Sequence, residues 1–311
     1  MKKIYFIFII LILVLTGCRK TDMKDNNVLP DKTVSVSETD TEAAETVIDE
    51  TTAAVETIAA ETVSEEETTA EEPVTEGETQ SLSAKRDEYY TGLVEQAKAE
   101  GRKIVYLTFD DGSAFLTPTV LDILDEYNVK ATFFVVGSYS PNEEFAKTEY
   151  NDIINRGHTL GIHSFTHSRA NIYASIENFS SDCDRMIEYV TNLTGYTPFL
   201  WRFPGGSATS FADSRMITEY IPYIESKGLI YYDWNVSSGD GSEATKADAV
   251  YQNVIDGVKK KDVSVVLMHD GSGHEETVAA LPGILDTLIN ELNCLVVPIT
   301  ESTVPVQAQI G

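Results

Sequence analysis

Short apolar runs alternate with longer amphipathic stretches from about residue 100 onward. Seven runs are rich in apolar and β-branched residues, as in strands buried on both faces: 103–109, 131–136, 159–165, 199–203, 229–234, 263–269 and 294–299. Between them, apolar residues recur at helical spacing in six stretches: 117–128, 142–157, 175–195, 213–228, 245–261 and 275–292. This alternation predicts an α/β fold with about seven parallel strands in a TIM-like barrel, complete or incomplete. A doubly wound open sheet is the alternative.

Charged side chains stand where these predicted strands end. The first predicted strand, in "IVYLTFDDG", runs directly into Asp110 and Asp111. Four later predicted strands carry one such residue each near their ends: His163, Arg202, Asp233 and His269. Asp-Asp-Gly also suits a turn, but a turn would explain only the two acids after the first strand and not the charged residues at the ends of the other four. Because the carboxyl ends of parallel strands share one rim, where barrel active sites are built, the pattern predicts a site there.

Two of these strand ends together suggest a metal site. His163 and His167 are four residues apart in "HSFTH", so one helical turn would bring both imidazoles to the same side. Two histidines and one carboxylate form a three-ligand set with open positions. Adjacent aspartates diverge, so one of Asp110 and Asp111 is expected to bind metal and the other to act as general base. Two unrelated surface histidines are the alternative.

The N-terminus has the features of an export signal. Lys2 and Lys3 precede an apolar run that ends at Leu15, which is shorter than the roughly 20 residues of a spanning helix. The sequence Leu-Thr-Gly-Cys that follows resembles a bacterial lipobox, which implies removal of residues 1–17 and lipidation of Cys18. The expected location is therefore the extracellular face of a bacterial cell membrane. A cysteine that follows an ordinary signal by coincidence is the alternative.

Residues 18–84 have a different composition. From residue 19 to residue 84 there are 18 acidic and 4 basic residues and no aromatic residue. Such a segment cannot bury enough apolar surface to offset the entropy of ordering, so we expect a disordered, extended tether. An acidic interaction tail is the alternative, and the Ala/Glu-rich part could be transiently helical.

Residues 85–311 are long enough for one domain with a substantial core. The chain carries a net charge of −27, which argues against nucleic acid as a partner. Cys183 and Cys294 are the only cysteines after Cys18, too few for a disulfide scaffold. We expect two buried thiols and a monomer, with a single Cys183–Cys294 bridge as the alternative.

Five segments, in order, resemble the motifs of the polysaccharide deacetylases, the NodB-homology domains of carbohydrate esterase family 4. They are "TFDDG", "HSFTH", "RFPGG", "DWNVSSGD" and "LMHD", spread over about residues 100 to 298. The resemblance implies a distorted (β/α) barrel. It also implies removal of acetyl groups from sugars with the help of a divalent metal.

The resemblance assigns a role to each matching residue. Asp111, His163 and His167 would bind the metal, with zinc as the expected ion and cobalt, nickel or manganese as alternatives. Asp110 would be the general base, oriented and kept ionised by Arg202. His269 would protonate the leaving amine, with its pKa raised by Asp240. The backbone N–H near Gly205 would stabilise the oxyanion, and Leu267 would line the acetyl pocket.

The chain departs from the family pattern at two places beside the acetyl pocket. Gly241 stands where many members have a tryptophan, so Trp234 or Trp201 would have to wall the pocket instead. Gly205 and Gly206 stand where a bulky residue often precedes glycine, which suggests a more open rim. Both departures bear on substrate preference and leave the expected metal ligands, base and acid unchanged.

The expected activity is metal-dependent removal of N-acetyl groups from N-acetylglucosamine of an acetylated polysaccharide. Peptidoglycan is the first choice, because the lipid anchor would hold the enzyme beside it. The alternatives are deacetylation of exopolysaccharide, chitin or xylan, and a non-catalytic glycan-binding surface lipoprotein. Neither H-E-x-x-H nor G-x-S-x-G occurs, which argues against ordinary peptidases.

Overall fold

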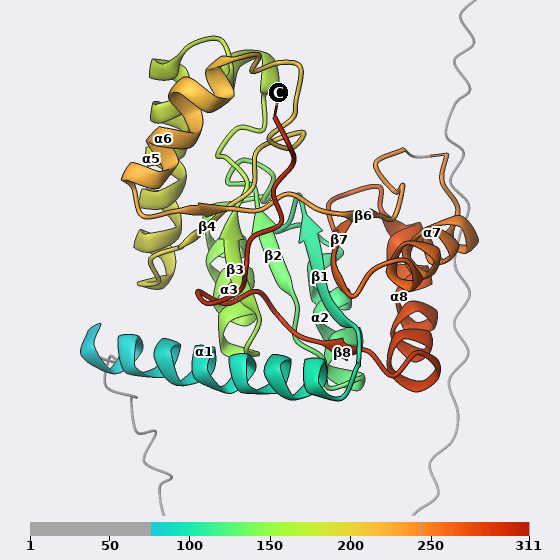
Figure 1. The fold of residues 1–311 in the computed structure, drawn as a ribbon. Helices are drawn as coiled ribbons and strands as arrows, with labels where there is room; N and C mark the ends of the chain where they lie inside the picture. The colour runs from blue at the N-terminus through green and yellow to red at the C-terminus, as the bar shows by residue number, and fades with distance from the viewer. Residues whose placement is uncertain (1–75, 243, 311) are drawn as a thin grey trace, which may run out of the picture. The chain divides into compact units, whose positions relative to one another are not determined.

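The computed structural model describes residues 76–242 and 244–310 (Figure 1). The predicted signal peptide, Cys18 and nearly all of the predicted tether lie outside these residues. Among the described helices, none combines the length and apolar character needed to cross a bilayer. The predicted start of the folded part, residue 85, falls inside helix α1 (Glu76–Ala99).

A curled sheet of parallel strands forms the centre of the fold. Its strands are β1 (Ile104–Asp110), β2 (Thr132–Val135), β3 (Thr159–Ile162), β4 (Leu200–Trp201), β5 (Ile230–Tyr231), β6 (Val236–Ser237), β7 (Val263–His269) and β8 (Leu295–Val296). Seven of them follow the order β5-β4-β3-β2-β1-β7-β6, and β8 pairs with the start of β1. In the described part of the chain no pairing joins β5 to β6, so the sheet is an open half-barrel.

The predicted α/β barrel-type fold is confirmed, with one strand more than predicted. All seven predicted strands form. The additional one is β6, whose two residues follow β5 closely and pair with β7. Strands β4, β5 and β8 are equally short but lie within apolar runs, whereas the one apolar residue of β6, Val236, stands between Asn235 and Ser237, so no apolar run marks this strand in the sequence.

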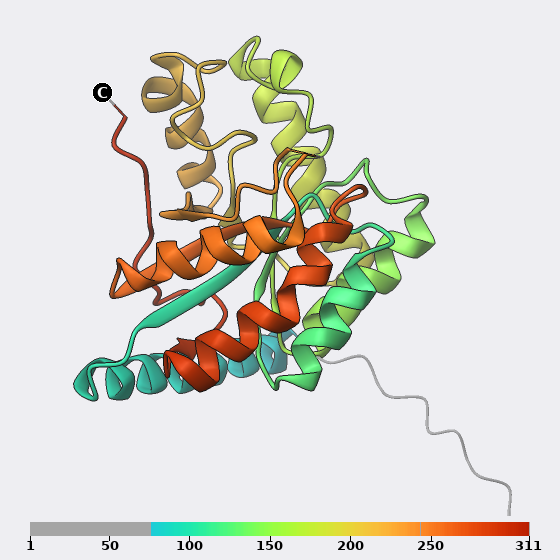
Figure 2. The ribbon, with the colours of Figure 1, turned by 90° about the vertical axis from the view of Figure 1, so that its right-hand side faces the viewer.

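Helices cover the outer face of the sheet where the amphipathic pattern predicts them. They are α2 (Thr117–Glu126), α3 (Glu143–Asn155), α5 (Ile176–Thr194), α6 (Ile221–Ser226), α7 (Ala247–Lys259) and α8 (Glu275–Asp286), with π-helical turns before α6 (Met216–Tyr220) and after α8 (Thr287–Glu291). Figure 2 shows α7, α8 and α2 side by side on this face. Helix α5 ends at Gly195, whose φ of 70° is the expected left-handed cap.

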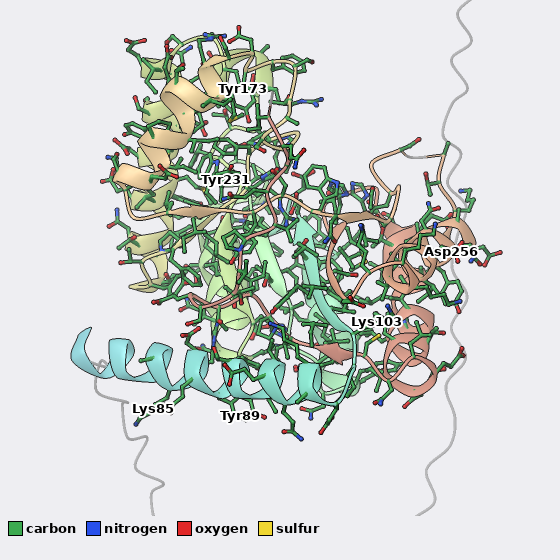
Figure 3. The ribbon with its side chains drawn as sticks, in the orientation of Figure 1. Lys85, Tyr89, Lys103, Tyr173, Tyr231 and Asp256 are labelled. Atoms are coloured by element: carbon green, nitrogen blue, oxygen red, sulfur yellow. The ribbon has the colours of Figure 1, made fainter. Side chains whose placement is uncertain are left out.

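Two helices were not predicted from the sequence. Helix α1 carries few apolar residues, and it lies across the end of the sheet where the strands begin (Figure 1). Its residues Lys85 and Tyr89 point away from the sheet (Figure 3), whereas Ala97 is buried. The other, α4 (Arg169–Ile172), is a single turn. Neither has the repeated apolar stripe on which a sequence-based prediction depends.

Side-chain alternation along the strands separates an outer core from an inner face. On β1, Val105, Leu107 and Phe109 pack in the larger core beneath the helices, whereas Ile104 and Tyr106 pack in a smaller inner one. Thr108 and Asp110 share the inner side with Ile104 and Tyr106, because alternate residues of a strand face the same way. The same alternation places the polar strand ends on the inner face.

The cysteines and most aromatic residues are structural. Cys183 and Cys294 are buried free thiols, as expected, and do not form the alternative bridge. Phe133, Phe203 and Tyr231 pack in the larger core. These side chains stabilise the sheet from outside and leave its inner rim to polar groups.

Candidate active site

Strand pairing brings the predicted base and the predicted acid together. Asp110 and His269 are paired positions on the neighbouring strands β1 and β7. His163 and Arg202 directly follow β3 and β4 on the same rim. The structure thus gathers residues that lie up to about 160 positions apart in the sequence into one site.

Asp110 is held by a completely buried arginine. Nη1 of Arg202 donates to Oδ1 of Asp110 at 2.8 Å and to the Thr108 hydroxyl at 2.7 Å. The remaining guanidinium nitrogens donate to the backbone carbonyls of Tyr232 and Asp233. Burial raises the pKa of the Asp110 carboxyl, and the charge of Arg202 opposes that rise. Asp110 is therefore fixed in place by a charge-assisted bond, as a general base requires.

Asp111 faces two histidines with an unsatisfied oxygen. Its Oδ1 is buried without a hydrogen-bond partner, 3.5 Å from Nε2 of His167 and 3.9 Å from Nε2 of His163. One ligand atom from each residue lies within 4.8 Å of the other two. A buried carboxylate oxygen is costly unless a donor or a cation satisfies it. The three residues therefore fit a divalent cation, and this set is the one predicted from the sequence.

Both histidines are oriented through their second ring nitrogen. Nδ1 of His163 lies 2.7 Å from the carbonyl oxygen of Arg202, and Nδ1 of His167 lies 2.9 Å from the Tyr139 hydroxyl. Such partners turn Nε2 toward a metal and are typical of histidine ligands. Burial, with the nearby His167, lowers the pKa of His163 to about 3, so its imidazole is neutral, as a ligand must be.

The loop between the histidines is a tight turn and not a helix. Ser164 and His167 have φ values of 77° and 53°. Asp182 of α5 holds the turn, because its carboxylate accepts from the backbone N–H groups of Phe165 and Thr166 and from the Thr166 hydroxyl. Sequence analysis missed Asp182 and Tyr139, since no local pattern marks a side chain that supports another segment.

His269 is paired with a carboxylate that has no free acceptor. Oδ1 of Asp240 lies 2.8 Å from Nδ1 of His269 and accepts from Ser238, and Oδ2 accepts from Thr277 and from the His269 backbone N–H. Burial opposes protonation of His269, but the bond to Asp240 and its charge outweigh burial and raise the pKa to about 9. The imidazole is therefore a charged proton donor at neutral pH.

The glycine-rich loop after β4 holds a backbone N–H, that of Gly205, without a partner among the described residues. Gly206, by contrast, donates its N–H to the Phe203 carbonyl. Asp233 supports this loop, since its carboxylate accepts from the backbone N–H groups of Ser207 and Ala308. The N–H of Gly205 thus suits the oxyanion role expected there.

The structure distinguishes between the two tryptophans considered for the acetyl pocket. Trp201 is completely buried in the larger core and cannot line the pocket. The Trp234 ring lies beside Gly206, 3.0 Å from where a Cβ would stand there. Leu267 belongs to neither apolar core and faces inward between β6 and β1. Trp234 is thus the tryptophan available to the site.

Beside Asp111 lies an open pocket of about 460 Å³. Its walls include Tyr139 and His274, and the His274 ring stacks on His269 with centroids 4.9 Å apart. His274 was not predicted from the sequence, because it lies in a loop after β7 with no motif around it. Asp111 is the metal-ligand candidate that lines this pocket, so the candidate set is open to solvent on this side.

Comparison with known proteins agrees with this geometry. The sequence profile of the family described as "Polysaccharide deacetylase" matches residues 97–219. Over 197 residues the chain is 32% identical to a peptidoglycan-N-acetylglucosamine deacetylase of Bacillus cereus, covering 60% of this chain and 66% of that protein. Over 200 residues it is 34% identical to peptidoglycan-N-acetylglucosamine deacetylase PgdA of Listeria monocytogenes, covering 64% of this chain and 38% of that protein. The chain thus spans less than two thirds of either relative.

One solved structure is, over almost its whole length, similar to this chain. It is the catalytic domain of peptidoglycan N-acetylglucosamine deacetylase from Eubacterium rectale, 36% identical, with a TM-score of 0.63. The match covers 68% of this chain and 94% of that domain. This overall similarity agrees with the half-barrel and the strand-end residues that this chain itself shows. The chain therefore belongs to the polysaccharide deacetylase family.

Proposed function

We propose that this protein is a metal-dependent deacetylase that removes N-acetyl groups from N-acetylglucosamine residues of peptidoglycan. The observation that carries the proposal is the buried, unsatisfied oxygen of Asp111 between His163 and His167, on the same rim as Asp110 and His269. Similarity to peptidoglycan deacetylases favours peptidoglycan over other acetylated glycans.

The side chains of the site divide the two proton transfers between them. Asp110 takes a proton from the water whose oxygen bonds to the acetyl carbon, and the N–H of Gly205 donates to the oxyanion that forms. The carbon–nitrogen bond then breaks, and the amine receives the proton that His269 carries. The products are acetate and a sugar amine. A divalent cation, held by Asp111, His163 and His167, would supply a positive charge that acidifies water and polarises the carbonyl; zinc is our first choice.

The proposal also covers the location of the protein in the cell. The apolar leader and the Leu-Thr-Gly-Cys sequence support lipidation of Cys18 and a position on the extracellular face of the cell membrane. The acidic residues that precede helix α1, 19–75, would then act as a spacer between the membrane and the catalytic part. A monomer is sufficient for this arrangement, because every proposed site residue belongs to a single chain.

Acetate release tests the proposed activity. The full chain, purified in detergent, is incubated with peptidoglycan, chitooligosaccharide and acetylated xylan, with added zinc or with a chelator. We expect release from peptidoglycan that the chelator abolishes. The variant Asp110→Asn removes the base and keeps its shape, and should lower the rate by at least about a hundredfold.

The outcome also separates the rival functions. Faster release from chitooligosaccharide or xylan than from peptidoglycan would reassign the substrate and keep the enzyme class. No release from any glycan by protein with bound metal would favour a non-catalytic glycan-binding protein. Unchanged release by Asp110→Asn would contradict the role of Asp110.

A further inference from the structure

Arg169 is an exposed cation close to the candidate active site. Among the residues that the structure describes, its guanidinium makes neither an ion pair nor a hydrogen bond. Arg215, close by in the fold, differs, since it pairs with Asp213 and donates to the carbonyl of Ala174. Arg86 and Arg185 also make no ion pair within the described part of the chain, but their contacts lie elsewhere: Arg86 donates to His158 and Thr159, and Arg185 lies over the Phe165 ring.

The side chain of Arg169 lies against the glycine-rich loop. Its Cδ and Nη1 are each 3.4 Å from where a Cβ on Gly205 would stand. The guanidinium carbon is 5.1 Å from the centre of the Phe211 ring, so a cation–π contact keeps the group near the loop. Arg169 also follows the metal-ligand candidate His167 by two positions. The positive charge therefore lies close to Gly205, whose N–H is expected to donate to the acetyl oxygen.

Glycine at position 205 is what leaves room for this arrangement. A larger side chain there would compete with Arg169 for the same space, because the contact is already at van der Waals distance. The family resemblance leads one to expect a bulky residue in this loop. In this chain a guanidinium thus occupies space beside Gly205 that a bulky side chain would enter.

We infer that Arg169 binds a carboxylate carried by the glycan next to the acetylated sugar, and so sets a preference for anionic over neutral substrates. The inference rests on the proposed deacetylase function. A guanidinium presents a planar pair of donors that matches a carboxylate, and Phe211 limits its freedom before binding. The carboxylate belongs either to a peptide attached to the glycan or to an acidic sugar, since the two groups share the same chemistry.

Binding of soluble fragments tests the inference without turnover. Calorimetry on the full chain carrying Asp110→Asn, which lacks the general base, would compare neutral chitotetraose, a peptidoglycan fragment with its peptide, and the same fragment after enzymatic removal of the peptide, which exposes the carboxylate of the sugar acid. Arg169→Ala should weaken binding of a carboxylate-bearing fragment about fivefold and leave chitotetraose unchanged. Arg169→Lys should recover only part of the loss, because it keeps the charge without the planar fork.

Lys147→Ala is the matched control. Lys147 is exposed on α3, and its removal changes the net charge by the same amount. A loss confined to the peptide-bearing fragment would place the carboxylate on the peptide, and a loss confined to the stripped fragment would place it on the sugar. An equal loss for chitotetraose, or no loss for any fragment, would overturn the inference. Failure of the proposed function would show separately, as absence of acetate release by the wild-type chain.

Discussion

Two groups of one aspartate and two histidines lie on the rim, and their carboxylates differ. In Asp111, His163 and His167, the buried Oδ1 of Asp111 has no hydrogen-bond partner. In the second group, formed by Asp240, His269 and His274, both oxygens of Asp240 accept hydrogen bonds. An oxygen that lacks donors favours a cation, whereas a carboxylate that already has its donors favours a proton on the neighbouring imidazole.

The histidines of the two groups differ as well, in the direction in which their pKa is shifted. Burial lowers the pKa of His163 to about 3, whereas Asp240 raises that of His269 to about 9 in spite of burial. His163 is thus neutral and ready to bind a metal, and His269 is ready to give up a proton. Similar residue types reach opposite states because their hydrogen-bond partners differ.

Removal of the Asp111 carboxylate should have the largest effect. Asp111→Ala takes away the charge of the three-ligand set, so we expect loss of bound zinc and a fall in acetate release of about a thousandfold or more. Metal per chain is measured by mass spectrometry after dialysis against zinc. Asp240→Asn is the comparison and should keep its metal. The opposite result, with metal lost only in Asp240→Asn, would reverse the assignment of the two groups.

Asp240→Asn should instead lower the pKa of His269, the proposed general acid. We expect a rate about a hundredfold lower and a basic limb of the kcat/KM profile that moves from about 9 toward 6.5, the ordinary pKa of histidine. Since folding raises the pKa of His269, the Asp240–His269 pair stabilises the wild type fully below about pH 6.5. This stabilisation is lost as the pH rises to about 9.

Unfolding by denaturant at about pH 6 and about pH 10 would measure that loss, which should be smaller in Asp240→Asn. Asp262→Asn provides the control, because Asp262 is exposed and precedes β7 at the end of the strand away from the site. An unchanged pH profile in Asp240→Asn would show that another group sets the protonation of His269.

Tyr139→Phe should have the smallest effect of the three. The change removes the hydroxyl that bonds Nδ1 of His167 and keeps the ring, so zinc affinity should fall about tenfold with little change in stability. A competitive chelator measures this affinity. Tyr89→Phe, exposed on α1, is the control. Equal zinc affinity in both variants would mean that Tyr139 does not orient the ligand.

Sequence patterns alone assigned the reactive residues to the carboxyl ends of particular strands. Apolar runs that end in Asp110, His163, Arg202 and His269 predicted one rim of a parallel sheet, and the structure places them there. The prediction succeeded because strand alternation and parallel pairing are local rules that act on every strand alike. The family resemblance added Asp240, which the structure indeed pairs with His269.

The support and the surroundings of these groups could not be predicted from the sequence and are visible in the folded chain. It showed the unsatisfied oxygen of Asp111, the turn held by Asp182, and Tyr139 behind His167. It also buried Trp201 and placed Arg169 against Gly205. These facts depend on contacts between segments far apart in the chain. Such contacts leave no periodic signal, and their energy comes from burial and hydrogen bonding that exist only once the chain is folded.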